Sequence, residues 1–148
     1  MEDRYLFKAK RLDWREFPEK EQWITGYYVL GFNEYEQPVH LIFEPTSMFF
    51  SHGETDGWTE VDPSTICRCT GLKDKNGTLI WENDIAKDEK GSLYKAFWQN
   101  NYYQFSWIWV KSEIFQVGIK WDLYAMRSFE IEVIGNIFDN PELLENEV

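Results

Sequence analysis

The sequence has little of what builds membrane spans, export signals or disulfide frameworks. Its uninterrupted apolar runs reach only four residues, as in Tyr27–Leu30 and Trp107–Val110, whereas a membrane-spanning helix needs about 20. The N-terminus carries charges at positions 2–4 and lacks the apolar stretch of a signal peptide. Its two cysteines, Cys67 and Cys69, are too close in sequence to bridge without strain. We therefore expect a cytoplasmic protein stabilised by its hydrophobic core.

Basic residues are also scarce. The 148 residues include 15 Lys and Arg against 26 Asp and Glu, a formal net charge of −11. This charge repels phosphate backbones and disfavours binding to nucleic acid. Aromatic residues, in contrast, make up 18% of the chain, which is far too hydrophobic for a disordered protein. The length predicts one domain or two small lobes.

Alternation of apolar and polar residues, the pattern of half-buried strands, runs through most of the chain. Between residues 23 and 30 both alternating sets are largely apolar, which is typical of a strand covered on two faces. Helix signals are few, the clearest being Asn140 and Pro141 before a short terminal helix at Pro141–Glu147. We predict a mainly β fold with strands at Trp23–Leu30, Val39–Phe43, Thr65–Cys69, Phe105–Val110, Phe115–Leu123 and Phe129–Val133.

Turn signals separate these strands. Asn33–Pro38 predicts a hairpin turn, and Phe50–Pro63 is interpreted as a surface loop because it is rich in Gly, Asp and Pro. Asn76-Gly77 is a strong hairpin signal and predicts a type I′ turn, in which both central residues have positive φ.

Residues that could form a metal site do not have the required spacing. Cys67 and Cys69 with His40 and His52 would supply the ligand types of a structural zinc site, but they do not match the usual zinc-binding spacings. Asp74-x-Asn76-Gly77 resembles a calcium loop only in part, because Leu79 occupies the position that requires glycine. We predict no metal-binding and no cofactor-binding residues.

Signs of catalysis are equally weak. Ser51-His52 is the one place where a hydroxyl residue precedes a histidine, but neighbouring side chains of an extended chain point in opposite directions. The acidic pairs Glu82/Asp84 and Asp88/Glu89 are interpreted as turn residues rather than an acid–base dyad. The sequences G-x-G-x-x-G, Walker A, H-E-x-x-H and G-x-S-x-G are absent. We predict no catalytic residues.

Aromatic residues are concentrated between positions 94 and 109. Because one sheet face cannot bury them all, we predict a partner surface there. Core packing with an oligomer contact is the favoured interpretation of the cluster as a whole, because aromatic residues are good strand formers, and stacking of single-stranded bases on exposed rings is another alternative. The aromatic surplus and exposed sheet edges also predict a homo-oligomer. The predicted partner surface comprises Tyr102, Tyr103, Trp107 and Trp109.

Two segments resemble the YopX family of phage and prophage proteins: TGLKDKNGTLIWENDIAK (Thr70–Lys87) and IEVIGNIFDNPELL (Ile131–Leu144). Asn83 stands where that family usually has glycine, and asparagine tolerates positive φ next best. The resemblance implies a mainly β protein of a bacterial host cell whose C-terminal half is similar to an SH3-like barrel. It implies no enzymatic activity and transfers no site residues, because the biochemical role of the family is not established.

Taken together, the residues and the resemblance predict a single YopX-like unit with two β-rich lobes, 1–69 and 70–148. We expect a non-enzymatic phage or prophage accessory protein that binds a host or phage protein. A nucleic-acid-binding module and a metal-dependent hydrolase or nuclease are the alternatives. The residues expected to shape the fold are Gly71, Asp74, Asn76, Gly77, Asp84, Gly135, Asn136 and Pro141.

Overall fold

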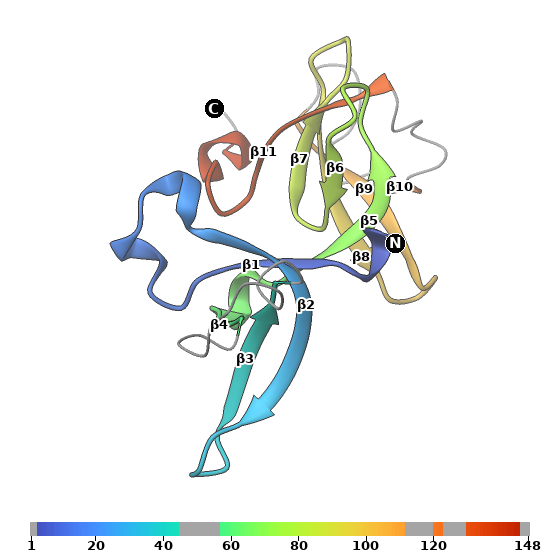
Figure 1. Cartoon of the computed structure of the whole chain (residues 1–148). Helices are drawn as coiled ribbons and strands as arrows, with labels where there is room; N and C mark the ends of the chain where they lie inside the picture. The colour runs from blue at the N-terminus through green and yellow to red at the C-terminus, as the bar shows by residue number, and fades with distance from the viewer. Residues whose placement is uncertain (1–2, 45–56, 112–119, 123–129, 146–148) are drawn as a thin grey trace. The chain divides into compact units, whose positions relative to one another are not determined.

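The computed structural model describes residues 3–44, 57–111, 120–122 and 130–145 (Figure 1). By the pattern of its internal contacts the chain divides into two units, Met1–Arg68 and Cys69–Val148. In the described ranges both units consist of antiparallel strands and short 3₁₀ turns. The predicted mainly β class is therefore confirmed.

The N-terminal unit is built on one antiparallel sheet with the strand order β4-β3-β2-β1. The first residues of β5 (Cys67–Lys73) add to the outer edge of β1, where Arg68 pairs with Phe7. The core of this unit comprises Ala9, Ile24, Ile42 and Val61. The other strands are β1 (Phe7–Lys10), β2 (Trp23–Phe32), β3 (Pro38–Phe43) and β4 (Trp58–Glu60).

Gly26 lies where β2 changes its main partner. The residues before it pair with β1, and those after it pair with β3 from Tyr27↔Phe43 onward. A Cβ atom at position 26 would lie 2.1 Å from the carbonyl oxygen of Phe43, so only glycine permits this approach. The β2–β3 hairpin therefore depends on a glycine inside an otherwise bulky strand.

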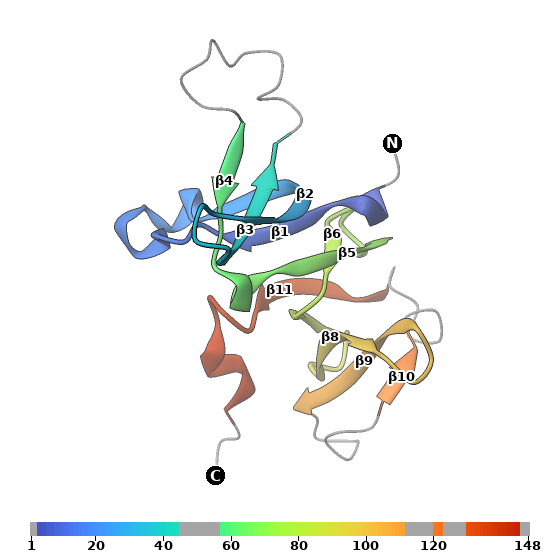
Figure 2. The same ribbon diagram turned by 90° about the horizontal axis from the view of Figure 1, so that it is seen from below.

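The C-terminal unit contains a five-stranded antiparallel sheet with the order β10-β9-β8-β7-β11, and Figure 2 shows β8, β9 and β10 side by side. The rest of β5 pairs with β6, whose Ile80 packs in the core with Tyr94, Trp107, Trp109 and Ile131. The strands are β6 (Leu79–Trp81), β7 (Asp84–Lys87), β8 (Leu93–Gln99), β9 (Gln104–Lys111), β10 (Lys120–Asp122) and β11 (Glu132–Asn136). The SH3-like barrel implied by the family resemblance stays a prediction.

Several expectations about individual elements were wrong. Residues 58–60 of the predicted surface loop form β4, because their backbone pairs with β3. The terminal helix is only a 3₁₀ turn over Pro141–Leu144, and Asn140 does not cap it. Of the predicted strand Phe129–Val133, Phe129 lies outside the described residues, and the strand observed there, β11, begins at Glu132. Of the predicted strand Phe115–Leu123, only 120–122 lies within the described residues, as β10.

The prediction that β2 is covered on two faces was also wrong for its second half. Val29 and Leu30 are exposed on opposite faces of β2, so no layer of the described residues covers either face there. Both faces of this half of β2 are apolar, as the sequence indicates, but no described segment covers them at these two residues.

Three hairpins share one turn design. In each, an Asx side chain accepts hydrogen bonds from the backbone N–H groups two and four residues later, at 2.9–3.0 Å. The fourth residue of each turn has positive φ. These are three-residue hairpin loops in which a type I turn is followed by a left-handed residue. They span 33–37, 74–78 and 88–92.

This design corrects the type I′ prediction for Asn76-Gly77. The predicted hairpin is confirmed, but Gly77 has φ +80° whereas Asn76 is not among the residues with positive φ. The carboxylate of Asp74 favours the three-residue loop because it binds two N–H groups that a type I′ turn would place differently. Gly91 fills the left-handed position of the third turn, whereas Glu36 fills that of the first with φ 59°.

Replacing Glu36 by glycine is expected to stabilise the protein by about 1 kcal/mol, because a side chain in the left-handed region is strained. Urea unfolding of the variant and wild type measures the difference. Glu34→Gly is the matched control, since Glu34 does not have positive φ. It should be neutral or destabilising. Equal destabilisation by both substitutions would contradict the strain at position 36.

Candidate functional site

The carboxylate of Asp74 connects the two segments that resemble the YopX family. Its Oδ1 accepts hydrogen bonds from the backbone N–H groups of Asn76 and Thr78, and its Oδ2 accepts one from Val133, each 2.9 Å long. The N–H of Lys75 donates to the carbonyl oxygen of Ile131 at 3.0 Å. Asp74 is buried, so these partners replace the water that a carboxylate otherwise needs. The role of Asp74 is structural.

The second segment forms a compact turn after β11. The Oδ1 atom of Asn136 accepts hydrogen bonds from the backbone N–H groups of Phe138 and Asp139, with an N···O distance of 2.9 Å in both. Asn140 packs against Gly135, where a Cβ atom would lie 2.3 Å from the Asn140 Oδ1 atom. The pairing of β11 with β7 shifts register between Val133 and Gly135. The strand is therefore irregular just before Asn136, and Pro141 follows the turn directly.

The acidic end of the first segment is also structural. Asn83 adopts φ 71°, as expected for a residue in place of glycine. Its N–H donates to Ala96, and its carbonyl oxygen accepts from Ile137. Asp84 is buried and its Oδ2 atom accepts a hydrogen bond from the N–H of Trp81 at 2.8 Å, which closes the turn that leads into β7.

Asp74→Asn should destabilise the protein by about 2 kcal/mol or more, because an amide oxygen cannot accept on both sides of the group and its NH₂ would face a donor. Asn33→Asp is the matched control. The amide oxygen of Asn33 already accepts the two hydrogen bonds that close the same kind of turn. Among the described contacts, Asn33 has no counterpart of the hydrogen bond from Val133 to Asp74. Its substitution should change the free energy of unfolding by less than about 0.5 kcal/mol. Denaturant unfolding tests the pair, and equal losses would contradict the role of Val133.

Asp88 in the third turn carries an additional contact that sequence reasoning missed. Its Oδ2 accepts a hydrogen bond from the hydroxyl of Tyr94 at 2.7 Å. Burial of the phenol raises the pKa of Tyr94 from 10.0 to about 12, and the hydrogen bond to Asp88 also contributes to the increase. The sequence does hold a signal for this turn, because Asp88-x-x-Gly91-Ser92 has the same spacing as Asp74-x-x-Gly77-Thr78.

Tyr94→Phe should cost about 1–2 kcal/mol at neutral pH, since it removes a hydrogen bond to a charged group. The folded pKa lies above the unfolded value, so stabilisation by the hydroxyl is present below pH 10.0 and lost as pH rises towards about 12. Thermal melts at increasing alkaline pH should therefore show wild type falling towards the variant. Tyr102→Phe, at an exposed site, should keep the wild-type pH dependence. A constant gap between wild type and Tyr94→Phe would contradict this assignment.

The four residues of the predicted partner surface divide into two groups. Tyr102 and Tyr103 are 68% and 83% exposed at the tip of the β8–β9 hairpin. Trp107 and Trp109, in the middle of β9, are 0% and 3% exposed and belong to the core. The predicted surface therefore loses both tryptophans, because they face Ile80 and Ile131 of the same unit.

The tip with Tyr102 and Tyr103 rests on an ordered base. Trp98 and Phe105 pair edge to face with ring centroids 5.0 Å apart. Next to this ring pair, the hydroxyl of buried Ser106 donates to the Gln99 Oε1 atom at 2.9 Å. Tyr103 itself has φ 50°, an unfavourable conformation for a bulky residue. The hairpin thus holds two aromatic rings in solvent at a conformational cost.

Among the described residues, the candidate metal ligands are not brought together as a site. Cys67 and Cys69 are buried, and the Sγ of Cys67 contacts the carbonyl oxygen of Thr65 at 3.2 Å. The His40 ring instead hydrogen-bonds the Tyr28 hydroxyl at 2.7 Å. Ser51 and His52 lie outside the described residues. Within the described ranges, no three His, Cys, Asp or Glu side chains are placed to hold a metal ion.

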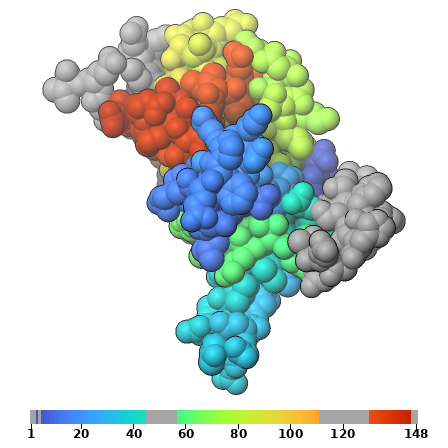
Figure 3. Space-filling view, turned by 60° about the vertical axis from the view of Figure 1, so that its left-hand side comes forward, coloured from blue at the N-terminus to red at the C-terminus, as the bar shows by residue number. Residues whose placement is uncertain are grey.

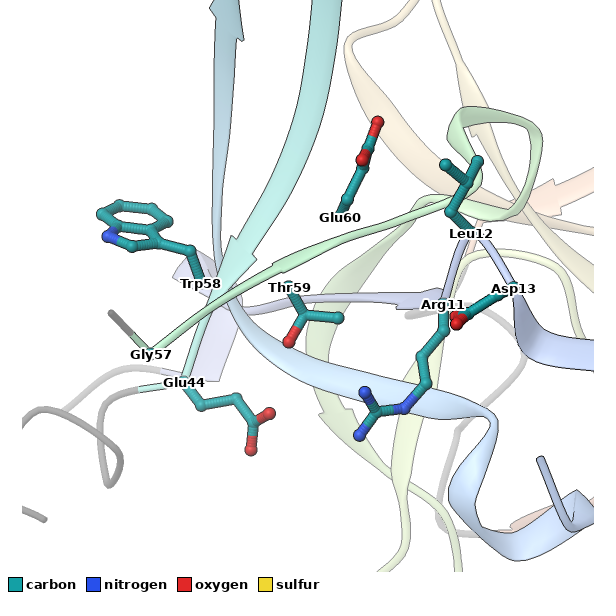
Figure 4. Close-up of a pocket in the computed structure, with 8 residues that line it drawn as sticks. All are labelled: Arg11, Leu12, Asp13, Glu44, Gly57, Trp58, Thr59 and Glu60. Atoms are coloured by element: carbon teal, nitrogen blue, oxygen red, sulfur yellow. The ribbon is translucent and has the colours of Figure 1, made fainter. Parts of the chain in front are cut away.

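An open pocket of about 580 Å³ lies in the N-terminal unit beside β4 (Figure 4). The Arg11 side chain on its wall is already engaged, since its Nε donates to Glu21 and its guanidinium lies 4.6 Å from the ring of Phe17. The described lining offers no nucleophile paired with a base. It consists of Arg11, Leu12, Asp13, Glu44, Gly57, Trp58, Thr59 and Glu60.

Three basic side chains of the N-terminal unit lie against the rings of Trp14 and Trp23. Lys10 Nζ lies 4.0 Å from the Trp14 ring centre, with Arg15 at 4.2 Å from the same ring. Lys8 Nζ lies 4.7 Å from the ring of Trp23. These cation–π contacts stabilise the segment before β2 and engage ring faces that a stacked base would need.

The comparisons identify the family. The family model described as YopX protein matches residues 15–145. The chain belongs to the YopX family. No curated protein matches it. Among solved structures, it is similar to protein EF1440 from Enterococcus faecalis, with 19% identity, a TM-score of 0.45, and coverage of 95% of this chain and 97% of that one.

The match of the YopX model includes both segments on which the resemblance rested. In this YopX protein, Ile131 and Val133 of the second segment hydrogen-bond to the Asp74 hairpin, and Ile137 after β11 donates to the carbonyl oxygen of Asn83. No helix in the described ranges is long and apolar enough to cross a membrane. The tip of the β8–β9 hairpin is the candidate functional site, because its exposed rings have no structural role among these contacts.

Proposed function

We propose that this YopX protein is a non-enzymatic accessory protein of a phage or prophage that binds a host or phage protein in the bacterial cytoplasm. The observation that carries the proposal is Tyr103, which is 83% exposed at φ 50°. Glycine or asparagine would fit this position with less strain. A bulky ring held there is better explained by contact with a partner than by folding.

The chemistry of the tip suits a protein partner. Tyrosine contributes a large contact area with few rotatable bonds, and it is enriched in the residues that dominate binding energy. The bonds of Gln99 and Ser106 below the tip order the hairpin before it binds. Such pre-organisation lowers the entropy lost on association.

The test is a capture experiment with the tagged full chain, in nuclease-treated lysate of its bacterial host at physiological salt. Tyr102→Ser combined with Tyr103→Asn removes both rings while keeping a residue that tolerates positive φ. Recovery of a bound protein should fall at least about tenfold relative to wild type. Tyr5→Ser, which removes another exposed tyrosine, should leave recovery unchanged. Equal recovery from wild type and the double variant would contradict the proposal.

Nucleic acid is the alternative partner, favoured by the cluster of Lys8, Lys10, Arg11 and Arg15. The net charge of −11 and the engagement of Trp14 and Trp23 by these cations count against it. Binding to single-stranded DNA that falls steeply as salt increases would favour this alternative over a protein partner.

A further inference from the structure

The second half of the β2–β3 hairpin extends past the strands that flank it (Figures 1 and 3). On one side, β1 pairs with β2 only over Trp23–Gly26. On the other, β4 pairs with β3 only over Leu41–Phe43. Among the described residues, the edge of β2 from Tyr27 to Phe32 therefore has no neighbouring strand.

This edge lacks the usual protection against pairing. Natural sheets place charges, prolines or bulges on their exposed edges. Neither β2 nor β3 contains Asp, Glu, Lys or Arg, in a chain whose net charge is −11. Apolar side chains are exposed on both faces instead, with Leu30 and Phe32 49% and 67% exposed on one and Val29 39% exposed on the other.

The backbone groups that point out of this edge can be identified. The N–H of Arg11 donates to the carbonyl oxygen of Gln22, so even-numbered residues of β2 face the β1 side. The N–H of Asn33 donates to Gln37, so odd-numbered residues face β3. It follows that the N–H and C=O groups of Tyr28, Leu30 and Phe32 point towards the open edge.

We propose that two copies of this chain pair antiparallel along this edge about a two-fold axis at Leu30. Leu30 then lies opposite Leu30 of the second copy, and Tyr28 opposite Phe32. The outward N–H and C=O groups of all three residues gain partners, and the aromatic side chains become cross-strand neighbours. Because the strand has no charged residues, the pairing brings no like charges face to face.

A second copy suits this edge in charge, and the exposed area allows a weak dimer. An uncharged antiparallel strand is complementary to itself, whereas the acidic remainder of the chain would require a basic partner. The exposed side chains of Val29, Leu30, Phe32 and Tyr35 offer roughly 400–500 Å² per copy. The two copies together would bury roughly 800–1,000 Å², which is less than the roughly 1,200 Å² of the smallest stable interfaces, so the dimer should be weak and depend on protein concentration. Added salt should strengthen it by screening the repulsion between acidic chains.

The test is sedimentation equilibrium of the full chain over a range of concentrations. The mass should rise from 17.8 kDa towards twice that value. Leu30→Asp and Leu30→Lys should each weaken association at least about tenfold, because like charges face each other at the axis. An equal mixture of the two should restore the dimer, since Asp then faces Lys. Leu12→Asp, at a leucine of similar exposure (53%), should dimerise like wild type.

A cross-linking measurement tests the register without introducing charge. Residues directly opposite in a hydrogen-bonded pair have Cα atoms about 5.5 Å apart, within disulfide range. Oxidised Leu30→Cys should therefore form a linked dimer, whereas Val29→Cys, which would lie opposite Gly31, should not. A wild-type mass of 17.8 kDa at every concentration would overturn the proposal. A Leu30→Asp/Leu30→Lys mixture that stays monomeric, or equal cross-linking at positions 29 and 30, would overturn the register.

Discussion

Three hydrogen bonds to the carboxylate of Asp74 hold the C-terminal unit together. Two close the hairpin around Gly77, and the third reaches Val133, 59 positions further along the chain. A buried carboxylate without such donors would be costly, and with them it acts as a rigid junction between two strands. The two segments that resemble the family meet at this carboxylate, so their shared residues are explained by their role in folding. A catalytic explanation for these residues is not needed.

The chain repeats one local solution at several places. An Asx residue, a type I turn and a left-handed residue close the hairpins at 33–37, 74–78 and 88–92. Asp74 and Asp88 use the second carboxylate oxygen for a longer contact, to Val133 and to Tyr94. Asn33 lacks that oxygen, and its hairpin is also the one whose distal half is exposed. The turn design is local, whereas the contacts that secure each hairpin depend on what lies beside it.

The aromatic residues show where sequence reasoning could not separate core from surface. Tyr103 and Trp107 are close in sequence and equally apolar in pattern. Trp107 lies in the middle of β9 and packs in the core cluster that contains Ile131. Tyr103 lies at the tip of the β8–β9 hairpin and is exposed. Periodicity gives the face of a strand, but it does not show how far neighbouring strands continue alongside it. The same limit applies to β2, whose apolar pattern predicted two covered faces although Val29 and Leu30, on opposite faces, are both exposed.

The sequence alone determined the mainly β class, the hairpins at Asn33–Pro38 and Asn76-Gly77, the positive φ of Asn83 and the membership suggested by its two motifs. These features depend on neighbours in the chain, through side-chain alternation and the few residues that tolerate left-handed backbone. The turn type at Asn76 and the contact between Asp88 and Tyr94 also arise within single hairpins, from side chains that sequence reasoning did not use. Only the tertiary structure decided the burial of Trp107 and Trp109 and the open edge of β2. The burial of the two tryptophans and the open edge depend on which distant segment packs alongside, and strand order and register are not encoded in local pattern.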